Sequence, residues 1–113
     1  MLAIKHRLTK QKDFDNVWQT GRSIFNECLG IKISKNKLAN SRFGFIVSAK
    51  ISKKAVDRNR IKRRLRGIIK DNIKHIKSGY DVIVITQKAI INTEHKDIED
   101  IVIKSLNKLG VIK

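Results

Sequence analysis

The sequence has no proline, a single cysteine and only 10 acidic residues among 113. Without proline or a stretch rich in glycine and serine, nothing marks a linker, so we expect one domain that spans residues 1–113. Cys28 alone cannot form an internal disulfide bond, and the N-terminus lacks the apolar segment and cleavage site of a secretory signal. The longest apolar run, residues 82–85, is far shorter than the roughly 18 residues that span a bilayer. These absences predict a cytoplasmic protein that does not cross a membrane.

Acidic residues are scarce relative to basic ones, since 26 lysines and arginines give a formal net charge of +16. This excess is far larger than solubility requires, so we expect a polyanionic partner, above all a nucleic acid. Disorder is the other common reason for a highly charged chain, but a hydrophobic fraction of 41% supplies enough apolar surface for a core. We therefore predict a folded domain with a basic surface.

The basic residues are densest in residues 50–66, where nine of seventeen positions are lysine or arginine and Asp57 is the one acid. Charge alone does not distinguish a nucleic acid from an acidic membrane surface. The run is also ordered, because Asn59 stands between two arginines and apolar residues recur at helical spacing. A helix of mixed charges is usually just solvated, but here like charges repel by roughly a few tenths of a kcal/mol per neighbour. We interpret the run as a nucleic-acid-binding surface.

Three helices are predicted from the spacing of apolar residues. The first covers residues 10–19 and ends near Gly21, with apolar side chains at i, i+3 and i+4: Phe14, Val17 and Trp18. A long helix is expected from a cap at Ser52 to a stop near residues 78–79. The last helix covers residues 98–109 and is followed by a glycine.

Strands are predicted between and after the first two helices. Residues 23–49 contain two or three extended segments, with a polar turn at residues 35–41. Residues 80–86 are continuously apolar at their centre, which is typical of a strand covered on both faces. The predicted order is helix, three strands, helix, strand, helix.

A helical wheel at about 100° per residue separates the charges of the long helix into two groups. The outward group lies opposite the isoleucine stripe and comprises Arg60, Arg63, Lys70 and Lys74. The border group lies nearer the stripe and comprises Arg58, Lys62 and Arg66. Because charged side chains are rarely buried unpaired, we expect the border group to emerge where the helix overhangs the edge of the sheet.

The order and identity of these residues match a known pattern. Residues 43–50, Ala55, Val56 and the run 58–66 resemble the signature of the bacterial ribonuclease P protein subunit. The resemblance extends to the strand at residues 80–85 and to the N-terminal segment, which shares Leu8, Thr9, Lys10, Asp13, Phe14, Trp18 and Gly21. It covers most of the chain, and only the last helix is generic.

The resemblance implies an α/β (α+β) sandwich in the order α-β-β-β-α-β-α. Its four-stranded mixed sheet would contain a left-handed β-α-β crossover, as in the second domain of ribosomal protein S5, contrary to the usual right-handed rule. The implied function is 5′ maturation of precursor tRNA, in which a catalytic RNA subunit cuts the phosphodiester bond. Mg²⁺ would be bound mainly through the RNA, and the protein would help to bind the substrate and supply no catalytic group.

The sequence itself offers no catalytic chemistry, which agrees with that division of labour. His6, His75 and His95 are scattered, and there is no metal-ligand spacing, no glycine-rich phosphate loop and no plausible pair of nucleophile and base. We therefore expect no catalytic residue and no metal ligand in this chain.

Two binding sites are implied by the resemblance. The loop and helix of residues 52–66 would bind the catalytic RNA, and we expect contacts from Lys53, Lys54, Arg58, Asn59, Arg60, Lys62, Arg63, Arg64 and Arg66. A cleft between the first helix and the sheet would bind the single-stranded 5′ leader of precursor tRNA, and we expect it to be lined by Phe14, Trp18, Lys32, Lys50, Arg58 and Lys62. Aromatic side chains stack on bases of any sequence, but Phe14 and Trp18 are equally well explained as core.

Two positions depart from the family's pattern. Lys32 stands where the family often has a further aromatic residue, so we expect an electrostatic contact there. Asp57 stands at a commonly apolar position, where it could cap the helix or pair with Arg60 or Arg64.

Three other interpretations compete. A noncatalytic ribosomal or RNA-assembly protein would share the basic helix but have no leader cleft, and the aromatic first helix argues against it. No helix-turn-helix pairing is recognisable, so we expect no DNA partner. A membrane-surface helix would need a free apolar face, whereas the strands require that face for the core.

Overall fold

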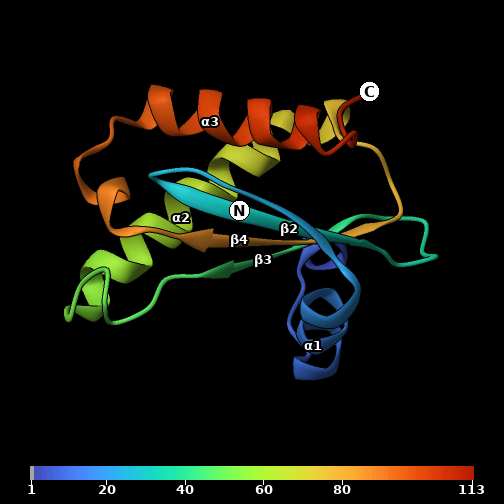
Figure 1. Ribbon diagram of the computed structural model, residues 1–113, viewed down its shortest axis with the longest axis horizontal. Coiled ribbons are helices and arrows are strands. Elements are labelled where there is room, and N and C mark those ends of the chain that lie inside the picture. The colour runs from blue at the N-terminus through green and yellow to red at the C-terminus, as the bar shows by residue number, and fades with distance from the viewer. Residues whose placement is uncertain (1) are drawn as a thin grey trace.

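The computed structural model describes residues 2–113, which form a four-stranded sheet with helices on both faces (Figure 1). Helices α2 and α3 lie on one face of the sheet, and α1 lies on the other. The helices are α1 (Gln11–Thr20), α2 (Ala55–Asn72) and α3 (His95–Lys108). The strands are β1 (Arg22–Phe25), β2 (Leu29–Lys35), β3 (Arg42–Ile46) and β4 (Tyr80–Thr86). The predicted order of elements is confirmed.

The strands lie in the order β1-β2-β4-β3, and the sheet is mixed. The β1–β2 hairpin and the β2–β4 pair are antiparallel, whereas β3 and β4 are parallel and are joined by α2. The Asn26 side chain closes the hairpin, because its Oδ1 accepts hydrogen bonds from the backbone N–H groups of Cys28 and Leu29. The expected β-α-β unit is therefore present, and its handedness stays a prediction.

Each face of the sheet has its own apolar cluster. The larger cluster joins alternate residues of β2 and β4 to the isoleucine stripe of α2 and to α3. Ile31, Val82 and Ile68 are fully buried at its centre. The smaller cluster lies under α1 and contains Leu8, Val17 and Ile83. Because α1 has only 10 residues, it covers only part of this face of the sheet.

The bounds of the long helix differ from the prediction. Helix α2 begins at Ala55 rather than after a Ser52 cap, and no side chain caps its first residue. It ends at Asn72, where the backbone tightens into a 3-10 turn, Ile73–His75, before the chain reaches β4. Two further 3-10 turns, Ile4–His6 and Lys88–Asn92, were not predicted because each is too short to show a period. None of the described helices is both long enough and apolar enough to span a membrane.

The prediction that β4 is covered on both faces is wrong at one end. Val82, Ile83 and Val84 are fully buried, but Ile85 is partly exposed on the α1 side. Its neighbour in β3, Ile46, is also partly exposed. The open part of this face is therefore apolar.

Candidate nucleic-acid interface

Helix α2 carries its charges on two distinct sides, as the wheel predicted. All members of the outward group are exposed, although Lys74 lies in the 3-10 turn beyond α2. The border group is partly covered, and Asn59 is exposed. Arg58 Nη1 donates a hydrogen bond of 2.8 Å to the Ser52 carbonyl, and the Arg66 guanidinium lies 6.0 Å from the centroid of the Phe45 ring.

The loop before α2 presents three exposed lysines, Lys50, Lys53 and Lys54. Ser52 supports this loop, because its hydroxyl accepts from the Lys54 N–H at 3.2 Å and donates to Asp57 at 3.0 Å. Asp57 thus lies in the first turn of α2, where a carboxylate is favourable beside the helix dipole. Of the two roles predicted for Asp57, pairing with Arg60 or Arg64 does not occur among the ion pairs of residues 2–113, and no side chain caps the N-cap residue of α2.

On the other side of the sheet, the strand register arranges side chains in two rows across the α1 face. The first row crosses from Lys32 to Ile83 and Gly44, and α1 lies over it. The second row lies two residues away along each strand, on the same face, and comprises Phe25, Gly30, Ile85 and Ile46. This row is partly open, and Phe25 is 51% exposed. We call it the open row.

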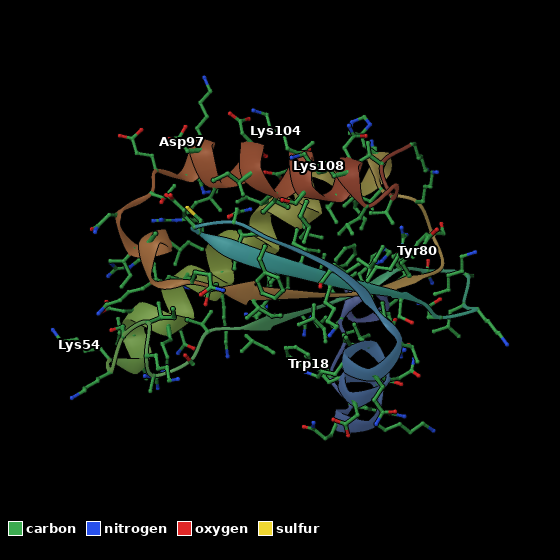
Figure 2. All side chains as sticks on the ribbon, viewed as in Figure 1. Trp18, Lys54, Tyr80, Asp97, Lys104 and Lys108 are labelled. Carbon is green, nitrogen blue, oxygen red and sulfur yellow. The ribbon has the colours of Figure 1, made fainter. Side chains whose placement is uncertain are left out.

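Phe14 and Trp18 occupy different environments on α1. The Phe14 ring packs with Leu8, Val17 and Ile83 and lies against Gly44, where an added Cβ would be 2.4 Å from Cζ of the ring. Only glycine permits this approach. Trp18 is 44% exposed and lies beneath the sheet beside α1 (Figure 2). Phe14 is thus at the margin of the core, and Trp18 is available for contact.

Lys32 stands over the Trp18 ring, with its Nζ 4.7 Å from the ring centroid. A cation at this distance from an indole face is attracted by about 0.5–1 kcal/mol at an exposed site. The contact holds a positive charge directly beside an exposed aromatic surface. Together these two side chains offer a base a stacking surface and a phosphate a counter-charge.

An ion-pair network fixes α1 to the sheet. Arg42 of β3 donates to both carboxylate oxygens of Asp81 on β4, at 2.8 and 2.7 Å, and to Asp13 of α1 at 3.2 Å. Asp81 is 3% exposed and also accepts from Asn36 at 2.9 Å. The hydrogen bond with Asp81 is the largest cause that raises the pKa of Arg42, although burial opposes it. Arg42 therefore stays charged throughout the physiological pH range and sets the position of α1.

The structure brings together only part of the predicted cleft. Phe14, Trp18 and Lys32 all lie at the α1 face. Lys50, Arg58 and Lys62 come from the loop after β3 and the first turns of α2, which covers the opposite face. In the described chain no hydrogen bond, ion pair or ring contact links these three cations to Trp18 or Lys32.

Arg66 is the α2 cation that the structure places nearest to the α1 aromatics. It lines a hollow of about 110 Å³ at the β3 edge together with Phe14, Thr9 and Gly44. The wheel placed Arg66 in the border group but could not show which residue of that group reaches α1.

Sequence reasoning missed the open row. Phe25 directly follows Ile24 in a strand of only four residues and precedes the Asn26 turn, so no alternation marks it. Its position became clear only from its pairing with Gly30, because the ring covers the space that a Gly30 side chain would fill. Ile46 and Ile85 were assigned to strands, but their partial exposure depends on the length of α1.

The described residues provide no site that fits a metal ion. No group of three or more histidine, cysteine, aspartate or glutamate side chains among residues 2–113 is arranged to hold one. His75 and His95 are exposed, and His6 Nδ1 lies 2.8 Å from the Ser41 carbonyl oxygen as a structural contact. The donor set of these residues therefore does not suit a protein-bound Mg²⁺.

Comparisons with known proteins agree on one family. The family model described as Ribonuclease P matches residues 2–110. The ribonuclease P protein component of Fusobacterium nucleatum is 42% identical over 106 residues, which cover 90% of this chain and 91% of that protein. The Staphylococcus aureus RNase P protein superposes with a TM-score of 0.87 at 29% identity and covers 96% of this chain and 98% of its own. The Thermotoga maritima RNase P protein gives a TM-score of 0.82 at 29% identity, with 90% and 96% covered.

Proposed function

The chain belongs to the ribonuclease P protein family, and from this premise we propose that it binds two RNAs on opposite faces of its sheet. It is a protein component of ribonuclease P, the endoribonuclease that matures the 5′ end of tRNA. The observation that carries the proposal is the separation of two basic surfaces. The outward charges of α2 lie on one side of the sheet, and the Trp18–Lys32 pair lies on the other.

The catalytic RNA is the proposed partner of α2 and its preceding loop. The outward group has no acidic partner within the described residues, and neighbouring arginines repel each other unless an anion neutralises them. The planar guanidinium suits phosphate oxygens, and the exposed Asn59 amide can donate to and accept from a base or a ribose hydroxyl. The RNA would thus complete the charge balance of this surface.

The single-stranded 5′ leader of precursor tRNA is the proposed ligand of the α1 face. The open row supplies a flat apolar floor, and Trp18 supplies a half-exposed ring on which a base can stack. Lys32 and Arg66 are placed to meet backbone phosphates on either side of α1. This arrangement favours a ribonuclease P protein over a ribosomal or assembly protein, which would not need an open aromatic face.

Mg²⁺ is proposed to act through the catalytic RNA, because the described residues lack a set of carboxylates that could hold it. When bound there, the ion supplies charge stabilisation for the cleaved phosphodiester. We also propose that the protein works in the cytoplasm and takes neither DNA nor membrane as a partner. In the holoenzyme its own side chains position RNA and carry out no proton transfer.

The division of α2 between two RNAs can be tested with two adjacent residues. Lys62 is partly covered and belongs to the border group, whereas Arg63 is exposed and belongs to the outward group. Lys62 lies on the same side of α2 as Arg66, which reaches the hollow beside Phe14 at the β3 edge, so a leader that leaves the α1 face past this edge could meet Lys62. We therefore expect Lys62→Ala to weaken precursor binding by about fivefold, the effect of one lost phosphate contact, and to leave assembly with the catalytic RNA nearly unchanged. We expect Arg63→Ala to do the reverse. Filter binding measures assembly, and titration of the assembled holoenzyme with precursor measures substrate affinity.

Arg58 and Arg60 provide the same test about one turn earlier in α2. We expect Arg58→Ala to weaken precursor binding more than assembly, and Arg60→Ala to weaken assembly more than precursor binding. Because Arg58 also donates to the Ser52 carbonyl, a thermal melt of each variant is needed to show that the loop still folds. Equal losses in both assays for Lys62→Ala and Arg63→Ala would contradict the proposed division.

The leader site can be followed through the fluorescence of Trp18, the one tryptophan in the chain. Stacking of a base on the indole is expected to quench its emission when a single-stranded leader oligonucleotide is added. We expect Trp18→Ala to weaken precursor binding by about 10-fold or more, because stacking contributes about 1–3 kcal/mol per base. Mature tRNA, which lacks a leader, is the control and should bind the variant and the original protein equally. A variant that loses affinity for both tRNAs alike would exclude Trp18 from the leader site.

A further inference from the structure

A second hollow opens on the other side of strand β1, between the β1–β2 hairpin and α3. Its volume is about 360 Å³, and its lining is mostly apolar. Ile24 and Ile101 form the floor, and Lys104 and Lys108 of α3 stand at the rim. Figure 2 shows both lysines on α3 above the sheet, with Trp18 below it. We call this hollow the β1–α3 groove.

The chemistry of the groove suits a nucleotide. Lys104 and Lys108 are both exposed and four residues apart, so they lie on one side of α3 and can meet the same phosphate backbone. Glu27 is the one acid that lines the groove, so positive charge predominates at its rim. The volume lies at the lower end of the 300–1,000 Å³ that is roughly typical of small-molecule sites, which suits one nucleotide. A base would lie on the apolar floor while its phosphate meets the lysines.

Phe25 connects this groove to the open row. Its ring covers Gly30 on the α1 face, and the residue also lines the groove. Strand β1 is an edge strand, since it pairs with β2 on one side only within the described sheet. Its outer edge therefore has free backbone N–H and C=O groups between the two sites. A single strand that follows the open row from Trp18 would reach Phe25, which belongs to that row and also lines the groove.

We propose that the β1–α3 groove is a distal site for the 5′ leader, which binds nucleotides that extend past Phe25 around the β1 edge. This inference rests on the proposed leader site at the α1 face. Lys104 and Lys108 bind two leader phosphates, and Phe25 stacks on the base that turns the edge. The distal site is insensitive to sequence, because it uses phosphates and one ring face rather than base edges.

Leader length is the variable that tests the distal site. Assembled holoenzyme is titrated with precursors whose leaders are lengthened one nucleotide at a time from the 5′ end of the mature tRNA. We expect the Lys104→Ala, Lys108→Ala double variant to match the original protein for short leaders. For leaders long enough to pass Phe25, it should bind about 10-fold more weakly. Loss of two single-strand phosphate contacts should also reduce the slope of log K against log salt by about 1.4 for those long leaders.

Two further variants make the outcome decisive. Lys96→Ala removes a lysine from the exposed surface of α3 outside the groove and should leave every leader unaffected. Phe25→Ala should weaken binding from the same leader length as the double lysine variant. The inference is overturned if the double variant equals the original protein at all lengths, or if it loses the same factor for mature tRNA.

A failure of the proposed leader site on the α1 face would give a different result from a failure of the distal site. Trp18→Ala should weaken binding of short and long leaders alike, because Trp18 lies before Phe25 on the path. If Trp18→Ala has no effect at any length, the leader site on the α1 face is wrong. If Trp18→Ala acts as expected and the double lysine variant does not, only the distal site is refuted.

Discussion

Raising the salt concentration from about 50 to about 200 mM is expected to weaken binding of the protein to the ribonuclease P RNA by about 10³-fold or more. The run at residues 50–66 has nine basic side chains against one acid. Apart from Arg42 and Arg7, the lysines and arginines of residues 2–113 form no ion pair with an acid of the protein. Contact with about six phosphates is enough to give this dependence, because each contact releases counterions from the RNA.

The measurement is a series of binding curves at constant Mg²⁺ and increasing monovalent salt. A triple variant, Arg60→Ala, Arg63→Ala and Arg64→Ala, should lower the slope of log K against log salt by about 2.7 if all three contact duplex phosphates. Lys35→Ala, at the exposed end of β2, is the single-charge control and should change the slope by much less. A triple variant with an unchanged slope would show that α2 does not bind the RNA backbone.

Arg42→Met is expected to lower the free energy of unfolding by about 3 kcal/mol or more. The substitution keeps the apolar stem but leaves the buried Asp81 carboxylate without its cation. A domain of this size has a total stability of only about 5–15 kcal/mol, so much of the protein would be unfolded under mild stress. Urea unfolding followed by circular dichroism measures the change.

Three comparisons separate the buried pair from the rest of the network. Asp13→Asn should cost at most about 1 kcal/mol, because the Arg42–Asp13 pair is longer, at 3.2 Å, and partly exposed. A double variant, Arg42→Met and Asp81→Leu, should recover part of the loss, since neither charge is then buried alone. If Arg42→Met unfolds at the same urea concentration as the original protein, the ion pair does not hold the sheet edge to α1.

The sequence was sufficient to predict the helices and strands with strong apolar periodicity and the distribution of basic residues on α2. The outward and border groups of α2 follow from a single angle per residue, so a wheel predicts them without any knowledge of the sheet. The end of α3 at Gly110 follows from its left-handed backbone, with a φ of 81°. The mixed sheet and its β-α-β crossover came from the resemblance to the family, because alternation alone does not say which strands are neighbours. The spatial order of the four strands was not predicted.

The parts that could not be predicted depend on contacts between distant residues. Lys32 meets Trp18, and Phe25 covers Gly30, only because of the register of β1, β2 and β4. Asp81 had no signal in the sequence, and it can be buried because Arg42, its direct neighbour in β3, pairs with it. Ser52 lies two residues before Lys54, the N-cap residue of α2, and supports the loop instead. Each of these roles is set by tertiary packing rather than by local sequence.

The contact of the Phe14 ring with Gly44 brings α1 close to β3, because Gly44 has no side chain to hold the helix away. If the leader binds on the α1 face as proposed, this close approach would admit a single strand and exclude a base-paired stem, which is much wider. Precursor would then be distinguished from mature tRNA by its unpaired 5′ end and not by its base sequence.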